Sequence, residues 1–263
     1  MSAITTKVPQ KFLIELHCHT FRSFDGFSTD QQLIEACQAK EIKALAITEH
    51  DVKCQVNVEA FRQQGISVIP GCEYTTDLGA HIIGLFVEQT LPVGSSRDAV
   101  FDSIVSQGGL VLLPHPWKLG SGYFTLYEPD ARLQQVDLME LYNGGWSAEA
   151  YQTDIRQLAE RYDIKLIGAS DAHKAWHIGY YVAAYDYAGD MPLQQLLQSV
   201  QPEIWVDRAR HKPPRALNSV QQVSLYQVLI KLFPAGLKHA IKRVLYWKKS
   251  QGYVHPQADY QRL

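Results

Sequence analysis

The sequence predicts an α/β protein with a mostly parallel sheet, arranged either as a barrel or as a doubly wound sheet. Short apolar runs of about four to six residues alternate along the chain with segments of helical periodicity. Polar residues rarely interrupt these runs, which is typical of strands covered by helices. Histidines and carboxylates gather just after several runs, and folds of this class place their active sites at those strand ends.

The first half of the chain is predicted to contain four strands and two helices. Ser28, Thr29 and Asp30 offer N-caps for the first helix, and Gly65 offers a C-cap for the second. The expected helices are residues 31–40 and 56–64, and the expected strands are residues 12–16, 43–48, 67–73 and 79–87.

The second half continues the alternation, with Gly108 and Gly109 ending its first helix. Runs 110–116 and 165–173 are each typical of a strand followed by a histidine. About seven strands within the first 207 residues are too many for a small open sheet and too few for a complete eight-stranded barrel of ~250 residues. The other expected elements are helices at 97–107, 147–162 and 193–200 and a strand at 136–143, while the short segments 180–186 and 203–206 belong to a last small unit that closes the body.

The composition is that of an ordinary globular protein, with 46% hydrophobic and 20% charged residues among 263. The first ten residues lack the apolar core of a signal peptide, and no apolar stretch reaches the ~20 residues of a membrane span. The four cysteines lie in the first third of the chain without a Cys-x-x-Cys pair, which favours reduced thiols. We therefore expect a cytoplasmic protein.

The net charge of −2 hides an uneven distribution along the chain. Residues 208–263 carry eleven Lys and Arg residues against one acid, whereas residues 1–207 carry 14 basic and 26 acidic groups. A Lys-Pro-Pro segment that begins at Lys212 marks a plausible boundary. The sequence thus predicts a domain at 1–211 and a basic amphipathic extension at 212–263.

The extension is predicted to be partly helical. Residues 225–233 are apolar enough to be buried, and residues 237–249 alternate apolar and basic groups at helical spacing. Such a helix can dock on the acidic body, lie on an anionic membrane surface or contact nucleic-acid phosphates. Between the last two, Trp247 and the neighbouring Leu and Ile residues favour peripheral membrane contact.

Imidazoles and carboxylates recur at the strand ends. His17 and His19 are two residues apart in a strand, so their side chains face the same way at a spacing that suits one metal ion. These donor types suit Zn, Mn or Fe, and a set of nine is too large for one tetrahedral ion. The candidate metal ligands are His17, His19, Asp25, His50, Glu73, His81, His115, Asp171 and His173.

The order of these motifs resembles the PHP (polymerase and histidinol phosphatase) domain family. The resemblance runs from about residue 12 to residue 207 and shows no departure at the nine candidate positions. It rests on six blocks, which are His17-x-His19-x3-Ser23-x-Asp25-Gly26, Thr48-Glu49-His50-Asp51, Gly71-Cys72-Glu73, His81-Ile82-Ile83-Gly84, His115-Pro116 and Ser170-Asp171-Ala172-His173.

The resemblance implies a distorted (β/α)7 barrel that binds two or three divalent ions, Zn, Mn or Fe. The implied activity is hydrolysis of a phosphate ester of a small molecule or nucleotide by a metal-activated hydroxide at a trinuclear site. The implied ligand sets are His17, His19, Glu73 and Asp171 for one ion, Asp25, His50 and His173 for a second, and His81 and His115 with Glu73 as a bridge for a third.

Three further residues are candidates for catalysis or substrate binding. Asp51 follows His50 directly, so it could protonate the leaving oxygen or, alternatively, orient an imidazole. Arg22 and Lys53 follow ligand positions on loops that should border the pocket, where either cation could pair with a phosphate.

Two other functions remain open. The same chemistry could serve a nuclease that acts on DNA or RNA ends, although the acidic body favours a small substrate or nucleic acid reached with the help of the basic extension. A non-catalytic scaffold would be expected to lack several ligands, and the sequence lacks none.

Overall fold

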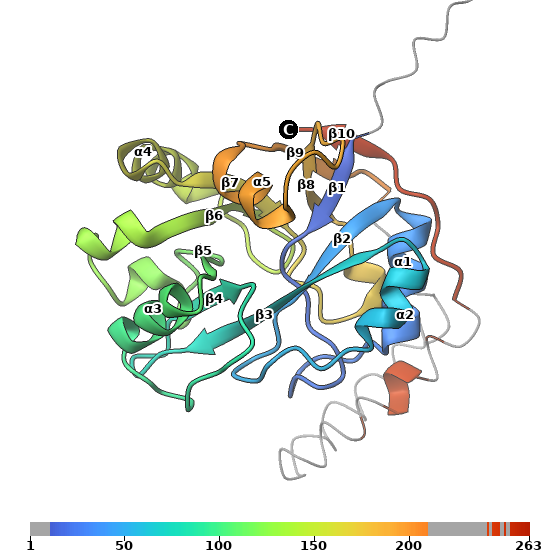
Figure 1. Ribbon diagram of the computed structural model, residues 1–263, viewed down its shortest axis with the longest axis horizontal. Coiled ribbons are helices and arrows are strands. Elements are labelled where there is room, and N and C mark those ends of the chain that lie inside the picture. The colour runs from blue at the N-terminus through green and yellow to red at the C-terminus, as the bar shows by residue number, and fades with distance from the viewer. Residues whose placement is uncertain (1–10, 210–240, 242–243, 248–249, 251–252) are drawn as a thin grey trace, which may run out of the picture.

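Ten strands form one curled sheet in the computed structural model, which describes residues 11–209, 241, 244–247, 250 and 253–263 (Figure 1). The strand order is β10-β9-β8-β1-β2-β3-β4-β5-β6-β7. The strands are β1 (Phe12–Glu15), β2 (Ile42–Ile47), β3 (Ser67–Thr75), β4 (His81–Leu85), β5 (Leu110–Leu113), β6 (Val136–Asn143), β7 (Lys165–Ala169), β8 (Tyr181–Tyr185), β9 (Glu203–Asp207) and β10 (Tyr260–Arg262).

Helices connect the strands, and most begin where the sequence offers a cap. The Thr29 hydroxyl accepts from the Gln32 amide, and the Gln32 side chain accepts from the Thr29 amide, so a capping box starts the first helix. The α-helices are α1 (Asp30–Ala39), α2 (Val58–Gln63), α3 (Arg97–Ser106), α4 (Gln152–Tyr162) and α5 (Leu193–Ser199), and the 3-10 helices are η1 (Tyr123–Thr125), η2 (Ala131–Gln135), η3 (Glu149–Tyr151) and η4 (Ala175–His177).

The helix predicted over 147–162 is split into η3 and α4. Tyr151 has a non-helical φ of −117° at the junction. Its ring stacks between Trp117, with centroids 5.6 Å apart, and Trp146, with centroids 5.9 Å apart. The aromatic packing accompanies the break, so tertiary contacts decide where this helix begins.

The sheet mixes parallel and antiparallel pairs. Strands β1, β2 and β3 are parallel neighbours, as are β5, β6 and β7. Strand β4 runs antiparallel to β3 and β5, and β8, β9 and β10 add three further antiparallel pairs. The prediction of a mostly parallel sheet therefore fails in these regions. Residues 76–80 join β3 to β4 and are too few for the crossover that parallel neighbours require.

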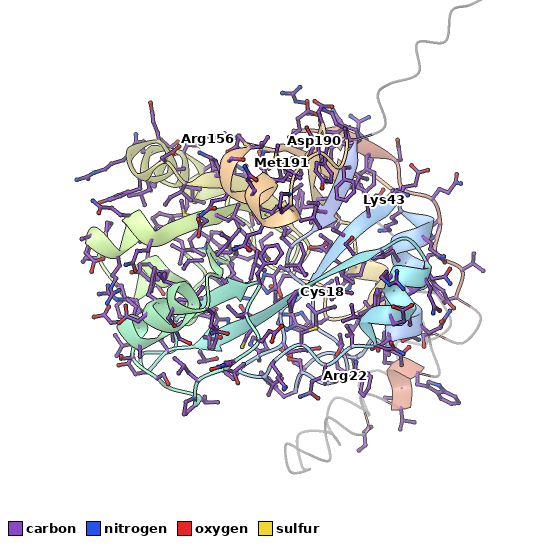
Figure 2. All side chains as sticks on the ribbon, in the orientation of Figure 1. Cys18, Arg22, Lys43, Arg156, Asp190 and Met191 are labelled. Atoms are coloured by element: carbon purple, nitrogen blue, oxygen red, sulfur yellow. The ribbon has the colours of Figure 1, made fainter. Side chains whose placement is uncertain are left out.

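The chain just beyond the edge strand β7 is hydrogen-bonded to the chain just beyond β1, which is fourth in the strand order. The His19 amide donates to the Ala172 carbonyl at 2.9 Å, and the Ala172 amide donates to the His17 carbonyl at 3.1 Å. The Thr48 amide donates to the Cys18 carbonyl at 2.9 Å, so the end of β2 joins the same network. Figure 2 shows Cys18 near the middle of the molecule, with Arg22 below it and Lys43 of β2 above it.

Apolar side chains fill the inside of the curl. One fully buried cluster draws on eight strands, which is the arrangement expected when a sheet wraps around its own core. Among its members with no exposed surface are Ile14, Ala46, Ile69, Ile83, Leu112, Leu138, Ile167 and Ala183.

The described part of the C-terminal segment packs against the body. Residues 241, 244–247 and 250 are helical, and Tyr246 is only 5% exposed. Further along, β10 pairs with β9 at the edge of the sheet. These contacts agree with docking on the body, while Val244 and Trp247 remain exposed.

Other predictions about this segment concern residues that the structure does not describe. The apolar segment 225–233, most of the basic helix 237–249 and the boundary at 211/212 lie outside the described residues. The two-part division of the chain and membrane contact by the extension therefore stay predictions. In the described part of the chain, no helix combines the length and apolar character needed to cross a membrane.

Candidate metal centre

The nine candidate ligands lie together at one end of the curl because the strand ends converge there. His17 and His19 follow β1, and Asp25 lies on the loop from β1 to α1. His50 follows β2 and pairs its backbone with that of Glu73 in β3. The remaining candidates are His81 at the start of β4, His115 after β5, and Asp171 and His173 after β7.

Glu73 is the hub of the site. Its Oε2 atom lies 3.4 Å from His17 Nε2, 3.3 Å from His19 Nε2 and 3.2 Å from His50 Nδ1. Its Oε1 atom lies 2.8 Å from His81 Nδ1 and 3.2 Å from His115 Nε2. One buried carboxylate thus faces five imidazoles, which is consistent with the bridging role that the sequence resemblance implies.

Asp171 stands beside the same inner imidazoles. Its Oδ1 atom lies 3.5 Å from His17 Nε2 and 3.6 Å from His19 Nε2. His17 Nε2 and His19 Nε2 lie 3.1 Å apart, and both rings are fully buried. Four side chains therefore meet at one point, and they are the four that the resemblance assigns to a single ion.

A second set opens toward the solvent. Asp25 Oδ2 lies 2.9 Å from His173 Nε2 and 3.3 Å from His50 Nε2. The His19 ring stacks on His50 and His173, with centroids 4.6 Å and 4.4 Å apart. The half-buried side chains of Asp25 and His173 make this the more accessible part of the site.

The electrostatics of the site keep its central carboxylates anionic. Burial by itself would raise the pKa of Glu73, but His81, His50 and His17 outweigh it and hold that pKa well below its usual range. Burial would likewise raise the pKa of Asp171, but His17 and His19 outweigh it and hold that pKa well below its ordinary value. An ionised carboxylate is the form that binds a cation.

The donor set fits divalent metal ions. Donor atoms that share an ion at ~2.1 Å stand about 3–3.5 Å apart in a tetrahedral arrangement, and the distances around Glu73 fall close to that interval. The Nδ1 atoms of His19, His50 and His115 are buried without a hydrogen-bond partner in the described structure. On His19 and His115 the other ring nitrogen, Nε2, faces Glu73 at 3.3 and 3.2 Å, so Nε2 is the atom placed to bind a cation.

Buried carboxylates beyond the ligands hold the imidazoles in place. Glu140 has no exposed surface, and its Oε1 atom lies 2.8 Å from His17 Nδ1. Its Oε2 atom accepts from the His115 amide at 2.7 Å and from Asn143 Nδ2 at 2.6 Å. Glu140 therefore fixes the orientation of one ligand and the backbone of another.

Two of the candidate ligands also have a strained backbone. His115 has a φ of +29° and Asp171 a φ of +50°, in the left-handed region that side chains other than glycine rarely adopt. Strain of this kind persists only where the surrounding structure enforces it, which is typical of functional sites.

The three remaining sequence candidates have other partners in the structure. The Asp51 carboxylate accepts from the Thr75 amide at 2.7 Å and from the Thr75 hydroxyl at 2.9 Å. The Arg22 guanidinium makes a bidentate ion pair with Asp30, with Nη1 2.5 Å from Oδ1 and Nη2 3.2 Å from Oδ2. The side chain of Lys53 is exposed. The described contacts thus give Asp51 and Arg22 structural partners outside the ligand set.

Lys118 is the basic side chain whose ion pair reaches the centre. Its Nζ atom lies 3.6 Å from Asp171 Oδ2, and the side chain is 35% exposed. The tight turn after β5 brings it there, with the Lys118 amide donating to the His115 carbonyl at 2.9 Å. Like Arg22 and Lys53, Lys118 follows a candidate ligand on a loop that the sequence already places at the border of the pocket, although the sequence favoured the other two.

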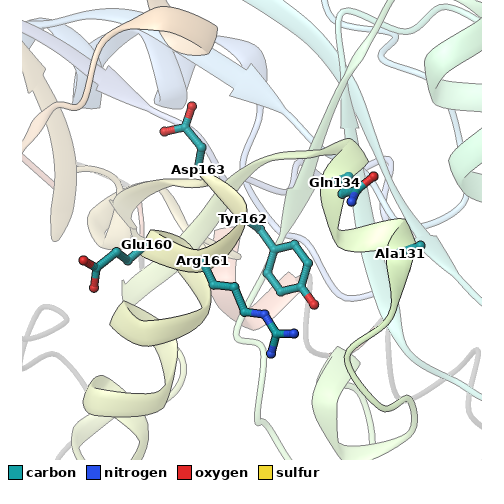
Figure 3. A pocket seen from close by; sticks show the side chains of 6 residues that line it. All are labelled: Ala131, Gln134, Glu160, Arg161, Tyr162 and Asp163. Carbon is teal, nitrogen blue, oxygen red and sulfur yellow. The ribbon is translucent and has the colours of Figure 1, made fainter.

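A separate surface hollow of about 540 Å³ lies between η2 and α4 (Figure 3). Gln134, Arg161 and Tyr162 are among the residues that line it. None of the nine candidate ligands borders this hollow, so it is distinct from the metal centre.

Comparison with known proteins identifies related sequences. Residues 15–200 match the PHP domain family. One uncharacterised protein of Methanocaldococcus jannaschii is 28% identical over 170 residues, which cover 63% of this chain and 67% of that protein. A second from the same organism is 30% identical over 146 residues, which cover 49% of this chain and 80% of that protein.

Three solved structures share the fold. A two-domain protein of Bacteroides vulgatus containing a predicted PHP-like metal-dependent phosphoesterase has a TM-score of 0.58 and 18% identity over 75% of this chain and 67% of that one. PsfC from Pseudomonas syringae has a TM-score of 0.57 and 18% identity over 84% and 99% of the two chains. A lesion-specific endonuclease from Pyrococcus furiosus has a TM-score of 0.54 and 13% identity over 74% and 58%.

The family match begins at the end of β1 and ends just after α5, so it takes in all nine candidate ligands. It covers well over half of the sequence, and the chain belongs to the PHP domain family.

Proposed function

We propose that this hydrolase cleaves phosphate esters at a centre of two or three divalent metal ions. The observation that carries the proposal is the convergence of five imidazoles on the buried carboxylate of Glu73. When bound in such a site, divalent ions supply Lewis acidity and lower the pKa of a coordinated water. The proposal includes the distorted (β/α)7 barrel as the architecture that brings the ligands together.

Each set of candidate ligands would hold one ion. His17, His19, Glu73 and Asp171 would hold the most buried ion, and Glu140 would keep His17 oriented toward it. The outer set of Asp25, His50 and His173 would hold a second ion, and His81 and His115 would hold a third together with Glu73. Zn, Mn and Fe all suit this mixture of donors.

Substrate recognition would begin with Lys118. Its ammonium group stands at the edge of the centre, where it would pair with a phosphate oxygen of the substrate. Arg22 and Lys53 remain candidates for a more distant part of the substrate. Asp51 remains a candidate proton donor, although its two hydrogen bonds to Thr75 favour a role in positioning His50.

The favoured substrate is a small phosphorylated molecule or a nucleotide. Residues 1–207 carry 14 basic against 26 acidic groups, and such a body repels a long polyanion. The likeness of fold to the lesion-specific endonuclease keeps a nuclease as the second candidate. The basic extension would then be the part that draws nucleic acid to the site.

A panel assay tests the proposal. Protein supplied with Mn, Zn or Fe would be offered p-nitrophenyl phosphate, histidinol phosphate, nucleotide 3′- and 5′-phosphates, bisphosphates and short oligonucleotides. We expect hydrolysis of at least one monoester and its loss in Asp171→Ala. Cleavage of oligonucleotides alone would select the nuclease, whereas the absence of hydrolysis of every compound with each metal would contradict catalysis.

The matched control for the panel is Glu59→Gln. Glu59 pairs with Arg62 on the exposed face of α2, at 2.7 and 2.8 Å, and belongs to no candidate ligand set. This variant should keep full activity, so a loss in Asp171→Ala can be assigned to the centre.

A further inference from the structure

The C-terminal segment reaches the loops that hold two of the candidate ligands. This segment lies beyond residues 15–200, the part of the chain that matches the family. Tyr246 is its most buried described residue, with 5% of its surface exposed. Its aromatic ring lies against Trp176 and Phe27, with centroids 4.9 Å and 5.5 Å away.

The hydroxyl of Tyr246 joins two loops that are distant in sequence. It accepts a hydrogen bond from the Ala175 amide at 3.2 Å and lies 3.4 Å from Ser28 Oγ. Ala175 is two residues after His173, and Ser28 is three residues after Asp25. The hydroxyl therefore contacts both chain segments within three residues of an outer candidate ligand.

The same two loops already meet at the ligands. The Phe27 amide donates to the His173 carbonyl at 3.0 Å, and His173 Nε2 lies 2.9 Å from Asp25 Oδ2. Tyr246 adds a bond at the far end of each loop. Together these contacts fix how closely Asp25 and His173 can approach one another.

Two further contacts, made by Ser250 and Tyr253, attach the C-terminal segment to the body. Gln32 Nε2 in α1 donates to Ser250 Oγ at 2.8 Å, and the ring of Tyr253 lies against Trp176 with centroids 5.8 Å apart. The segment is thus attached on both α1 and η4. Because the segment is attached at these points, the hydrogen bonds of Tyr246 can restrain the two loops.

We propose that Tyr246 is a positioning residue for the outer set of metal ligands, so that the C-terminal segment completes the site. This inference rests on the proposed function, because it concerns the same centre. The ligands of the most buried ion have separate support, because Glu140 contacts the His17 ring and also accepts from the His115 amide. Loss of the Tyr246 hydroxyl should therefore weaken binding of one ion and leave the tightest ion unchanged.

The test uses the full chain and the variants Tyr246→Phe and Ser28→Ala. Each removes one partner of the hydroxyl contact and keeps the packing of the segment. Metal-free protein would be titrated with Mn²⁺ or Zn²⁺ in competition with a chelating indicator, and kcat would be followed against free metal concentration. The control is Tyr253→Phe, a change of the same chemistry in the same segment.

We expect Tyr246→Phe to weaken one ion by roughly tenfold, the lower end of what is lost when a group orienting a metal ligand is removed. High free metal should restore kcat, with KM unchanged. Ser28→Ala should shift the same ion in the same direction, and Tyr253→Phe should shift none. A purely structural role would lower the melting temperature without this selective loss.

Two results would overturn the inference, and a third concerns the proposed function. Metal affinities unchanged in both Tyr246→Phe and Ser28→Ala, or equally reduced for every ion, would refute the positioning role. An equal loss in Tyr253→Phe would refute it as well. Wild-type protein that binds less than one ion per chain would contradict the proposed function itself, so the two failures are distinguishable.

Discussion

At the scale of single residues, the centre is an arrangement of charges that are held by their neighbours. Glu73 remains anionic in a fully buried position because several imidazoles surround it. Those imidazoles are oriented in turn by groups such as Glu140, which has no exposed surface. Removal of an orienting group should therefore damage metal binding even though every ligand is still present.

Glu140→Gln tests this dependence. The glutamine keeps the size of the side chain, but it removes the negative charge opposite His17 and the strong acceptor for the His115 amide. We expect a metal affinity about 10- to 100-fold lower, measured by competition with a chelator. Glu59→Gln on the exposed face of α2 serves as the control, and equal affinities in the two variants would contradict the role of Glu140.

Lys118→Met tests the proposed phosphate contact. The change keeps the length of the side chain and removes the charge near Asp171. We expect kcat/KM for a phosphate monoester to fall about tenfold or more, since a charge-assisted hydrogen bond of about 1.5–3 kcal/mol is lost. Metal content should not fall.

The control for Lys118 is Lys165→Met. Lys165 pairs with the exposed Asp163 at the start of β7, at the opposite end of that strand from the ligands. Kinetics that are unchanged in Lys118→Met, or reduced equally in both variants, would argue against a substrate contact at Lys118.

Residue types and spacing were enough to predict which metal-donor side chains lie together, but not which basic side chain stands beside them. His17, His19 and Glu73 could be found because metal donors at strand ends have few other uses. The choice among Arg22, Lys53 and Lys118 depends on which acid each side chain meets after folding. Asp30 pairs with Arg22 only because α1 begins beside that loop, a fact of tertiary structure.

At the scale of elements, the last strands of the body are tied to α1 by a buried ion pair. Lys40 Nζ lies 3.1 Å from Asp207 Oδ2, and the two side chains are 2% and 1% exposed. Asp207 Oδ1 also accepts from the amides of Ala209 and Asp259, so the same carboxylate holds the returning C-terminal segment beside β9.

Asp207→Asn should destabilise the protein strongly. The asparagine can still accept from both amides, but it leaves the Lys40 ammonium buried without a counter-charge. We expect the free energy of unfolding to fall by about 3–5 kcal/mol, measured by urea denaturation. Asp186→Asn breaks an exposed ion pair with Lys11 and should cost less than about 1 kcal/mol. Equal losses in the two variants would contradict this account.

Periodicity located most elements and failed where partners decide their direction or limits. The strand predicted over 136–143 is confirmed as β6, because a buried apolar run has few alternatives. The antiparallel direction of β4 depends on the short connection through residues 76–80 and on pairing with β5. The start of α4 depends on the stacking of Tyr151, which no local pattern reveals.

At the scale of the whole molecule, the chain ends by returning to the body. The sequence showed a basic, amphipathic extension, but its composition left docking, a membrane surface and nucleic acid all open. The structure places Tyr246 against the two loops that carry Asp25 and His173, and β10 beside β9. Neither contact has a sequence signature, because each depends on surfaces that form only after the body has folded.

Acid should destabilise the molecule partly through His177. Burial, together with Lys174 and His173, lowers the pKa of His177 to about 4 from an ordinary value of 6.5. The unfolded chain therefore takes up a proton as the pH falls through 6.5, whereas the folded chain does not until about pH 4. The contribution to stability that is present at high pH is lost across this interval.

Urea unfolding at pH 8 and pH 5 measures this loss. We expect the fall in unfolding free energy between the two pH values to be about 2 kcal/mol smaller in His177→Gln than in the wild type. The glutamine does not titrate, so it removes only this contribution. An equal fall in both proteins would show that His177 protonates alike in the folded and unfolded states.

The central claim is that Glu73 organises a centre with more than one metal ion, and metal content tests it most directly. Wild-type protein, Glu73→Gln and the control Glu59→Gln would be loaded with Mn or Zn, dialysed and analysed for bound metal per chain. We predict two or three ions in the wild type and in Glu59→Gln, and at least one ion fewer in Glu73→Gln. Less than one ion in the wild type, or undiminished metal in Glu73→Gln, would contradict the account.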